Sequence, residues 1–465
     1  MAMKKHSKTK LYALILAFII IDSALIVWVF IPKALPEAPG KVLKVLTRHD
    51  FSIKFYMEQA FLNSSQAKEH NISDINWITT SAESWPTDIQ IYSPDIIFGG
   101  GPQTFNNLYN KGFLVKLNSN RMLAALERVN DTIGGANMKR FDDDGDVVWC
   151  ASAFSTFGFT INKAWLSSHG LPFPTHWENL TSAEYGQFLP ITPTISMRNS
   201  VGSTSCTRIY EIIIQKFGWV KGWEILTRMV GNSGNLTTSI ELALLPVKNN
   251  NTGVAVSIDF YGYTAMLSNP NTEYRIPVNG SVINGDPIAI CGTTSDQDAA
   301  EAFIDWVLSD DGQKQWLREE INRLPVLESA FQTGIGYNLE FLYEIYNETL
   351  ANTYITFNVS LALSYELSLM YYFDAVLNDA QADLRHCWNK LVQAYLNMAI
   401  SQAEFESFAA QLGAPLTWDS TTFTETYAIS INSQLDSNPS FLTTIRNTWT
   451  DAAISRYNSL EALIP

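Results

Sequence analysis

The chain has 465 residues, of which 46% are hydrophobic, and a formal net charge of -15 at pH 7. An apolar fraction of this size is enough to bury a large core. The strong negative charge argues against nucleic acid and anionic lipid surfaces as partners.

The chain begins with a basic segment, residues 1–10, followed by an apolar run over residues 11–31. A membrane-spanning helix needs about 20 apolar residues, whereas a signal-peptide core has about 7–15 and ends at a small-residue cleavage site. We therefore expect a retained signal-anchor. Because basic flanks stay inside, residues 1–10 would be cytoplasmic and the bulk of the chain extracellular, on a single-pass membrane protein. A cleaved signal peptide is the alternative.

Residues 32–40 are rich in proline, which is typical of a stiff linker. Strands are then expected at residues 42–46, 75–78 and 95–98, with helices at 51–61 and from Pro102. This alternation predicts a parallel sheet with right-handed crossovers in residues 41–150, the first part of lobe 1. Ligands of such sheets bind beyond the C-terminal ends of the strands, where Asp50 and the glycines at 99–101 lie.

A second α/β segment is expected over residues 151–262, which we assign to lobe 2. Its helices are predicted at 208–217 and 220–230, and a buried strand at 253–258. Residues 263–333 return to lobe 1. The remainder, residues 334–465, is expected to be helical, with no strand before Thr422. Its helices carry apolar faces, so it should pack on the lobes; a separate helical domain is the alternative.

No motif of a known catalytic site occurs in the sequence, and no enzymatic activity is expected. The acidic run at residues 142–146 lacks the spacing of a calcium-binding loop, which favours a solvated turn. Cys150, Cys206, Cys291 and Cys387 are compatible with one or two disulfides or with buried free thiols. Sequons for N-glycosylation recur along the chain and fit a surface glycoprotein.

Three segments have a physical logic for ligand binding. The first contains Gly100, Gly101 and Thr104, where a strand runs through glycines into a helix whose free N–H groups attract anions. The second contains Ser200, Gly202, Ser203 and Thr204 and makes a similar cradle. The third contains Asp259, Tyr261 and Tyr263, whose oxygens suit a cation, an amine or a metal. Ser155 and Thr156 are further candidates to line a cleft.

Each of these segments also has a structural alternative. The two helix starts would serve equally well as a tight turn and an ordinary N-cap. The tyrosines would suit a core at a hinge between lobes.

The order of these segments resembles the extracellular solute-binding proteins of ABC transporters, in the two-lobed type II class that includes ferric-iron, thiamine and polyamine binders. The resemblance covers about residues 41–325. It is carried by the segments at 43–50, 95–105, 155–158, 200–211, 218–224, 286–290 and 302–313.

The resemblance implies an α/β, type II periplasmic-binding-protein fold that closes on a small molecule or ion and delivers it to an ABC permease in the membrane. It implies no cofactor. Ferric-binding relatives use adjacent tyrosines, whereas Gly262 separates Tyr261 from Tyr263 here. The alternatives are a membrane-anchored glycosidase or peptidase, which would bring carboxylates together in the cleft, and a surface adhesion protein, which would need no cleft.

Overall fold

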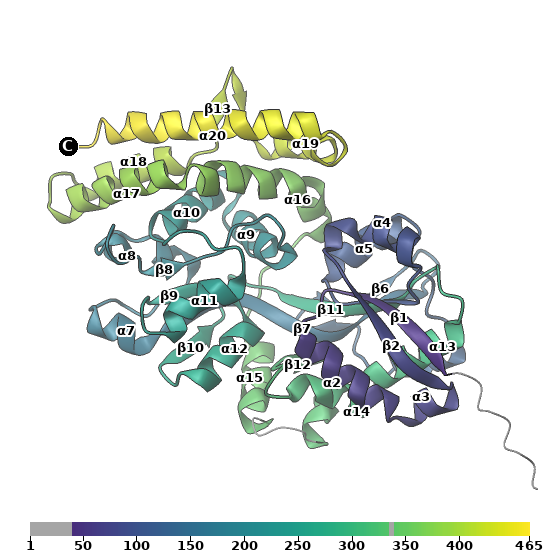
Figure 1. Cartoon of the computed structure of the whole chain (residues 1–465). Coiled ribbons are helices and arrows are strands. Elements are labelled where there is room, and N and C mark those ends of the chain that lie inside the picture. Colours follow the sequence, from purple (N-terminus) through teal and green to yellow (C-terminus); the bar gives the residue numbers. More distant parts are fainter. Residues whose placement is uncertain (1–39, 334–338) are drawn as a thin grey trace, which may run out of the picture. The chain divides into compact units, whose positions relative to one another are not determined.

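The computed structural model describes residues 40–333 and 339–465 of the chain (Figure 1). The expected basic flank at 1–10, the expected membrane segment at 11–31 and all of the linker except Gly40 lie outside the described residues. In the described part of the chain, no helix is both long and apolar enough to cross a bilayer. Residues Val42–Pro465 form one compact unit.

Lobe 1 is built on a mixed sheet with the strand order β2-β1-β3-β11-β7. Strands β1 and β3 run parallel, with Val45 opposite Ile96, whereas β11 runs antiparallel to β3 and β7. The parallel arrangement expected within residues 41–150 is therefore confirmed for β1 and β3, and β7 runs in the same direction as both. Strand β11 lies outside that range and runs the other way, because the chain returns from lobe 2 in the opposite direction. The strands are β1 (Lys41–Thr47), β2 (Ile72–Thr79), β3 (Ile96–Phe98), β7 (Val147–Asn162) and β11 (Ile283–Ile290).

Helices cover both faces of this sheet, as the alternation of buried residues requires. Along β3, Ile96 and Phe98 enter one apolar cluster, and Ile97 enters another on the opposite face. The lobe-1 helices are α2 (Phe51–Leu62), α3 (Ser65–Glu69), α4 (Trp85–Tyr92), α5 (Pro102–Asn110), α6 (Asn120–Leu126), α13 (Gln297–Val307) and α14 (Asp310–Gln313). Short strands β4 (Thr132–Ile133), β5 (Ala136–Asn137), β6 (Lys139–Phe141) and β12 (Leu324–Pro325) complete the lobe.

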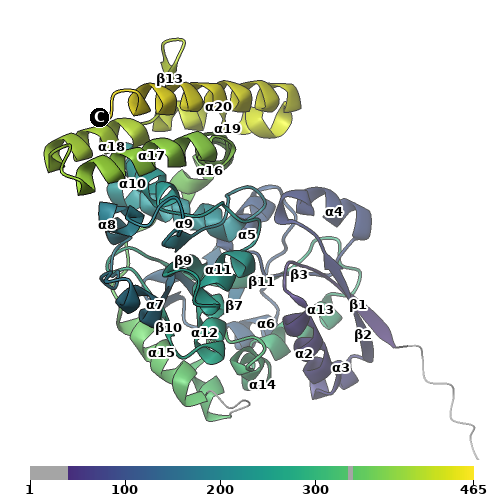
Figure 2. The ribbon, with the colours of Figure 1, turned by 60° about the vertical axis from the view of Figure 1, so that its left-hand side comes forward.

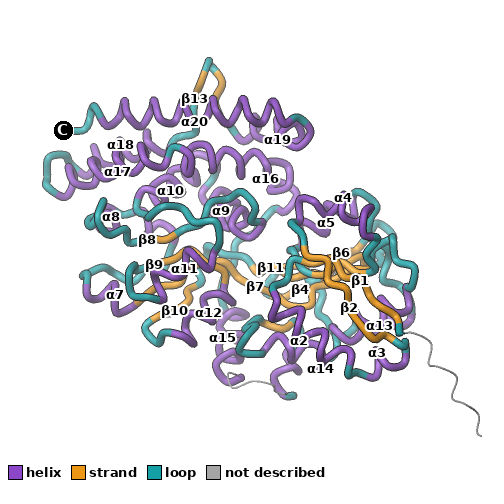
Figure 3. Tube along the Cα trace, in the orientation of Figure 1, coloured by secondary structure: helices purple, strands orange, loops and turns teal. Residues whose placement is uncertain are grey.

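Strand β7 belongs to both lobes, as the orange strands in the centre of Figure 3 show. It pairs with β11 up to Thr156 and with β9 (Val254–Ile258) from Phe157 onward. The change of partner between two consecutive residues marks the passage from lobe 1 to lobe 2. The expected boundary at residues 150/151 falls inside this strand.

Lobe 2 is a smaller sheet, in which β9 lies between β7 and the parallel strand β8 (Ile195–Ser196), with β10 (Thr272–Arg275) on β7. Helix α9 begins at Thr204, earlier than periodicity indicated, because Ser203 caps it by accepting from the N–H of Cys206. The lobe-2 helices are α7 (Lys163–Ser168), α8 (Ala183–Gly186), α9 (Thr204–Phe217), α10 (Trp219–Gly231), α11 (Ile240–Lys248) and α12 (Asp259–Ser268).

The C-terminal tail divides its contacts between the lobes. Helix α15 (Leu339–Ala351) places Leu342 and Tyr346 in the core of lobe 1. The following helices form a layer over α9 and α10, coloured green to yellow in Figures 1 and 2, and share one apolar core with lobe 2. They are α16 (Val359–Phe373), α17 (Gln381–Leu396), α18 (Gln402–Gly413), α19 (Glu425–Ser437) and α20 (Pro439–Glu461).

The tail contains an unexpected hairpin, and the state of the cysteines decides between two expectations. A short hairpin of β13 (Thr417–Trp418) and β14 (Thr421–Thr422) occurs in the tail, where no strand was expected before Thr422. All four cysteines are buried free thiols, which decides against disulfides in this structure.

Candidate functional site

A cavity of about 270 Å³ lies between the two lobes. Its walls are the segments that follow strands β1, β3 and β9, together with the starts of helices α5, α9 and α11. This is the place where an α/β sheet of this kind is expected to bind a ligand.

The loop between β3 and α5 brings bare backbone to the cavity. Gly100 and Gly101 have φ angles of 109° and 82°, which favour glycine. A Cβ on Gly100 would lie 2.9 Å from the ring of Trp85. Helix α5 has Gly101 as its N-cap and no side-chain cap, so its first N–H groups are open to a ligand in the cavity.

The start of α9 faces this loop from lobe 2. Gly202, Ser203, Thr204 and Ser205 line the cavity there. Arg48, which follows β1 in lobe 1, donates from Nη1 to Oγ1 of Thr204 over 2.7 Å. A lobe-1 guanidinium thus lies at the positive end of a lobe-2 helix, a combination that favours negative charge.

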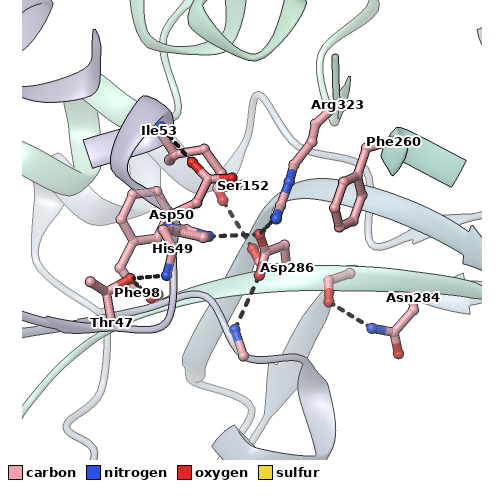
Figure 4. Close-up of polar contacts among 12 residues, drawn as sticks. Thr47, His49, Asp50, Ile53, Phe98, Ser152, Phe260, Asn284, Asp286 and Arg323 are labelled. Carbon is pink, nitrogen blue, oxygen red and sulfur yellow. Dashed lines mark hydrogen bonds and ion pairs between the residues drawn. The ribbon is translucent and has the colours of Figure 1, made fainter. Parts of the chain in front are cut away.

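Asp286 lines the cavity and is the centre of a group of polar contacts, which Figure 4 shows. Its Oδ2 accepts from His49 Nε2 at 2.8 Å and from Arg323 Nη1 at 2.5 Å, and its Oδ1 accepts from the N–H of Gly100 at 3.2 Å. Burial alone would raise the pKa of Asp286, but the charges of His49 and Arg323 hold it at about 2. Asp286 is therefore a paired carboxylate that fixes the glycine loop.

Arg323 is held between Asp286 and an aromatic ring. Its guanidinium carbon lies 4.2 Å from the ring centroid of Phe260, at the start of α12 in lobe 2. Figure 4 shows the guanidinium between the two side chains. Arg323 therefore links the lobe-1 carboxylate to the opposite wall of the cleft.

Arg208 of α9 joins three parts of the molecule. It donates from Nη2 to the side-chain oxygen of Gln103 in lobe 1, lies 3.6 Å from Glu211 and covers the ring of Phe357 in the tail at 4.4 Å. Neither carboxylate oxygen of Glu211 has a hydrogen-bond partner among the described residues. Burial raises the pKa of Glu211 to about 7, although Arg208 opposes the shift.

The lining of the cavity is predominantly cationic. Four arginines, at positions 48, 198, 208 and 323, lie in its wall, whereas the carboxylates are Glu241 and the paired Asp286. Arg48 and Arg198 form no ion pair with any described residue and donate hydrogen bonds to neutral oxygens. The cavity is thus positive inside a chain that is acidic overall.

Part of the expected ligand-binding set comes together at this cavity. The residues that line it are Gly100, Gly101, Ser155, Gly202, Ser203, Thr204 and Tyr261. They come from both helix starts, from strand β7 and from the first turn of α12, so segments far apart in the sequence meet at one cavity.

Three other expected residues have local structural roles. Asp50 is the N-cap of α2 and accepts from the N–H of Ile53 at 3.0 Å. Thr104 donates to the carbonyl of Gly100 at 3.0 Å. Ser200 donates to the carbonyl of Met370 at 2.6 Å and thereby ties lobe 2 to the tail. None of the three lines the cavity.

The expected cation-binding end is not assembled, because Asp259 and Tyr263 lie in the first turns of α12 and point away from the cavity lining. Asp259 is 1% exposed and accepts from the N–H of Thr156 at 2.7 Å, so Asp259 and Thr156 hold the lobe crossover. Thr156, which was expected to line the cleft, is buried and is not part of the cavity wall. Burial raises the pKa of Asp259 to about 7. Tyr263 is buried in the lobe-1 core.

Comparison with known proteins identifies the family. The model of the bacterial extracellular solute-binding proteins matches residues 93–341. The chain belongs to this family. Its curated relatives include the phosphoglycerate transport regulatory protein PgtC of Salmonella typhimurium, which is 29% identical over 181 residues. That match covers 38% of this chain and 42% of PgtC, so the chain spans less than half the length of this relative.

Solved structures confirm the α/β type II fold for this solute-binding protein. The periplasmic binding protein AfuA from Actinobacillus pleuropneumoniae, with fructose-6-phosphate bound, matches with a TM-score of 0.54 at 15% identity, over 77% of this chain and 100% of AfuA. The spermidine/putrescine protein PotD from Streptococcus pneumoniae matches with a TM-score of 0.53 at 16% identity, over 72% and 99% of the two chains.

Sequence reasoning missed the charged residues of the site. Arg48, Arg208 and Arg323 stand in different segments, and one arginine in a sequence looks like any solvated arginine. Only Arg198 adjoins a segment expected to bind a ligand, two residues before Ser200. The one available signal was the position of Arg48 and His49 directly after a buried strand, where functional side chains of this solute-binding protein gather.

Proposed function

We propose that this solute-binding protein captures a small anionic molecule carrying a phosphate group between its lobes and delivers it to an ABC permease. The observation that carries the proposal is the pair Arg48 and Thr204: an arginine of one lobe meets the start of a helix of the other, at the cavity. Arginine and helix N-termini are the two protein groups best suited to phosphate oxygens.

The charges around the cavity support this ligand class over a cationic one. Asp286 is neutralised by His49 and Arg323, and Asp259 is used by the lobe crossover. A polyamine would meet four arginines. The described residues contain no group of three or more His, Cys, Asp or Glu side chains that could hold a metal ion.

The names of the related proteins point the same way. PgtC is named for phosphoglycerate transport, and AfuA has fructose-6-phosphate bound. Both molecules carry a phosphate ester. The hydrolase alternative predicted carboxylates that converge in the cleft, but of the two carboxylates in the cavity wall Asp286 is paired, which favours binding over catalysis.

We further propose that the apolar run at residues 11–31 anchors the protein, with the binding unit outside the cell. The support is the basic flank at residues 1–10, which favours an inner location for the N-terminus. Protease added to intact cells is expected to digest the binding unit; protection of the unit in sealed cells would contradict the topology.

Isothermal titration calorimetry tests the ligand class. Glycerol 3-phosphate is expected to bind, while glycerol, spermidine and ferric citrate are expected to give no heat of binding. Inorganic phosphate should bind more weakly than glycerol 3-phosphate because it lacks the organic part. Binding of spermidine but not of any phosphate compound would contradict the proposal.

A further inference from the structure

A second cavity of about 950 Å³ adjoins the cleft cavity. The two share four lining residues, Pro102, Arg208, Asn284 and Gly285, which therefore form the partition between them. One wall of the second cavity is the loop at residues 352–358, which runs from α15 on lobe 1 to α16 on lobe 2 (Figure 1). We name this loop the strap and the cavity the strap chamber.

The strap is fixed at several points, so the chamber has a defined wall. Ile355 donates its N–H to the carbonyl of Ser281 at 3.1 Å. Asn358 and the side chain of Gln215 exchange two hydrogen bonds of 2.8 and 3.0 Å. The hydroxyl of Tyr354 donates to the carbonyl of Thr349 at 2.7 Å. Preorganised walls of this kind reduce the cost of binding.

Two donors, one beside the partition on its cleft side and one in the partition itself, have no good acceptor among the described residues. Gln103 Nε2 is buried and has no hydrogen-bond partner in the described chain, although Gln103 Oε1 accepts from Arg208. The Nδ2 of half-buried Asn284 makes one long hydrogen bond, of 3.4 Å, to the carbonyl of Gly285. A buried donor without an acceptor is unfavourable, so oxygen atoms of a ligand beside these two amides would be favoured.

The chamber lining has the chemistry of a site for hydroxyl groups. Side-chain amides and hydroxyls both donate and accept, as sugar hydroxyls do, and ring faces pack against apolar C–H surfaces. The amide and hydroxyl side chains are Asn106, Asn110, Asn137, Asn352, Thr353, Thr356 and Ser360, and the rings include Trp149, Tyr354 and Phe357.

The charges in the chamber leave room for such a neutral group. Lys139 is paired with Asp131 at 2.7 Å. Arg140 lies over the ring of Tyr109 at 5.1 Å and forms no ion pair among the described residues, and Arg208 belongs to the partition. Because the cleft wall carries four arginines and the chamber adds only Arg140 to the shared Arg208, an anionic group is best placed in the cleft, with the uncharged part of the molecule in the strap chamber.

We propose that the strap chamber holds the hydroxylated, sugar-like part of a solute whose anionic group occupies the cleft cavity. This inference rests on the proposed function and deepens it. The solute would cross the partition at Asn284, with Gln103 on the cleft side, and the C-terminal tail would help to select the ligand through the strap.

The test compares a short and a long phosphate ester by titration calorimetry on the protein and on bulk-adding variants. The short probe is glycerol 3-phosphate; the long probes are trehalose 6-phosphate and sucrose 6-phosphate. Thr356→Trp fills the chamber from the strap, and Ser360→Trp does so from the first turn of α16; both residues are exposed. Thr443→Trp, on an exposed position of α20, is the matched control.

At least one long probe is expected to bind ten times more tightly than glycerol 3-phosphate. Thr356→Trp and Ser360→Trp should each abolish that difference, with the melting temperature unchanged, and Thr443→Trp should preserve it. An unchanged ratio of affinities in both chamber variants, or binding of glycerol 3-phosphate with no gain for either long probe, would overturn the inference and leave the proposed function standing. Failure of every phosphate ester to bind would overturn both.

Discussion

Trp388 of α17 donates its indole N–H to Oδ1 of Asn232, the residue that ends α10, over 2.6 Å. Asn232 in turn donates to the carbonyl of Leu180 at 2.9 Å. A Cβ on the neighbouring Gly231 would lie 2.6 Å from the indole ring, so the ring rests directly on the lobe-2 backbone. The tail and lobe 2 are therefore bound by one buried contact that is both apolar and polar.

Removal of this indole should destabilise the whole binding unit. Trp388→Ala is expected to lower the free energy of unfolding by about 3–5 kcal/mol, because it empties a fully buried site and leaves Asn232 with an unpaired oxygen. Denaturant unfolding of the protein measures the change. Trp418→Ala, at a half-buried ring of the tail hairpin, should cost much less. Equal losses of unfolding free energy in the two variants would contradict a dominant role of Trp388 in the contact between the tail and lobe 2.

Arg48 should contribute directly to ligand affinity. Arg48→Met keeps much of the side-chain length but removes the charge at the start of α9, so the affinity for glycerol 3-phosphate should fall at least about tenfold, or about 1.4 kcal/mol. The control is Arg446→Met, which removes an arginine paired with Asp379 at 2.8 Å in the tail. A loss of the same size in both variants, or in neither, would contradict the assigned role.

Bulk at Gly101 should close the approach to the helix start. Gly101 has a φ of 82°, and its Cβ position lies 3.4 Å from Asn284 Nδ2. Gly101→Leu therefore adds strain and fills the cavity wall, and we expect at least a tenfold loss of affinity for glycerol 3-phosphate, about 1.4 kcal/mol. Gly112→Leu shares a positive φ but has open space around its Cβ, so it should leave the affinity unchanged while showing the cost of strain alone.

Stability should fall as pH rises from about 5 to 8. Burial and the charge of Glu211 raise the pKa of Glu366 from its ordinary value to about 8, and burial raises that of Glu211 to about 7. The folded protein then binds more protons than the unfolded chain between these values and about 4.5. The stabilisation that these two carboxyls contribute is therefore fully present below about pH 4.5 and is lost as pH rises toward 8.

Denaturant unfolding at a series of pH values tests this dependence. Glu366→Gln removes one of the two interacting carboxyls and should flatten the decline, with a gain on the order of 1–3 kcal/mol near pH 8. Glu348→Gln, on an exposed position of α15, should leave the pH profile unchanged. A profile that rises with pH, or one that Glu366→Gln does not alter, would contradict the assignment.

Ligand binding should close the lobes about the point where β7 changes partner, between Thr156 and Phe157. The reason is that β7 runs continuously from one lobe into the other, a geometry that suits hinge closure. Small-angle scattering should show a smaller radius of gyration with saturating glycerol 3-phosphate. An unchanged radius in a sample that calorimetry shows to be saturated would count against hinge closure.

Local signals in the sequence were enough to place the two helix starts of the site. Gly100 and Gly101 before Pro102, and Ser203 before Thr204, report backbone geometry within a few residues, and such geometry can be read from residue types. The strand β7 was harder, because Ser, Thr and Gly interrupt its apolar residues although all of it is buried. Its burial arises from elements on both faces, which the strand's own sequence does not report.

The directions of the side chains around Asp259 could not be predicted from the sequence, because they depend on the residue at which the helix begins. The sequence placed Asp259, Tyr261 and Tyr263 after a strand, and β9 does end at Ile258. The chain then enters α12 at once, so alternate residues diverge by a helical rotation. Tyr261 faces the cavity, whereas Asp259 and Tyr263 are buried elsewhere. A difference of one residue in where a helix begins decides which side chains meet a ligand.

The pairing of β3 with β11 constrains how the protein emerges from the ribosome. Strand β3, Ile96–Phe98, cannot pair with Ile288–Ile290 of β11 until that segment has been synthesised. Every residue of lobe 2 is synthesised in between. The N-terminal half of lobe 1 therefore leaves the ribosome with an open sheet edge, a state that invites aggregation. Lobe 2 cannot be complete either until α16–α20 follow. We expect the nascent chain to depend on holding factors until its last helices appear.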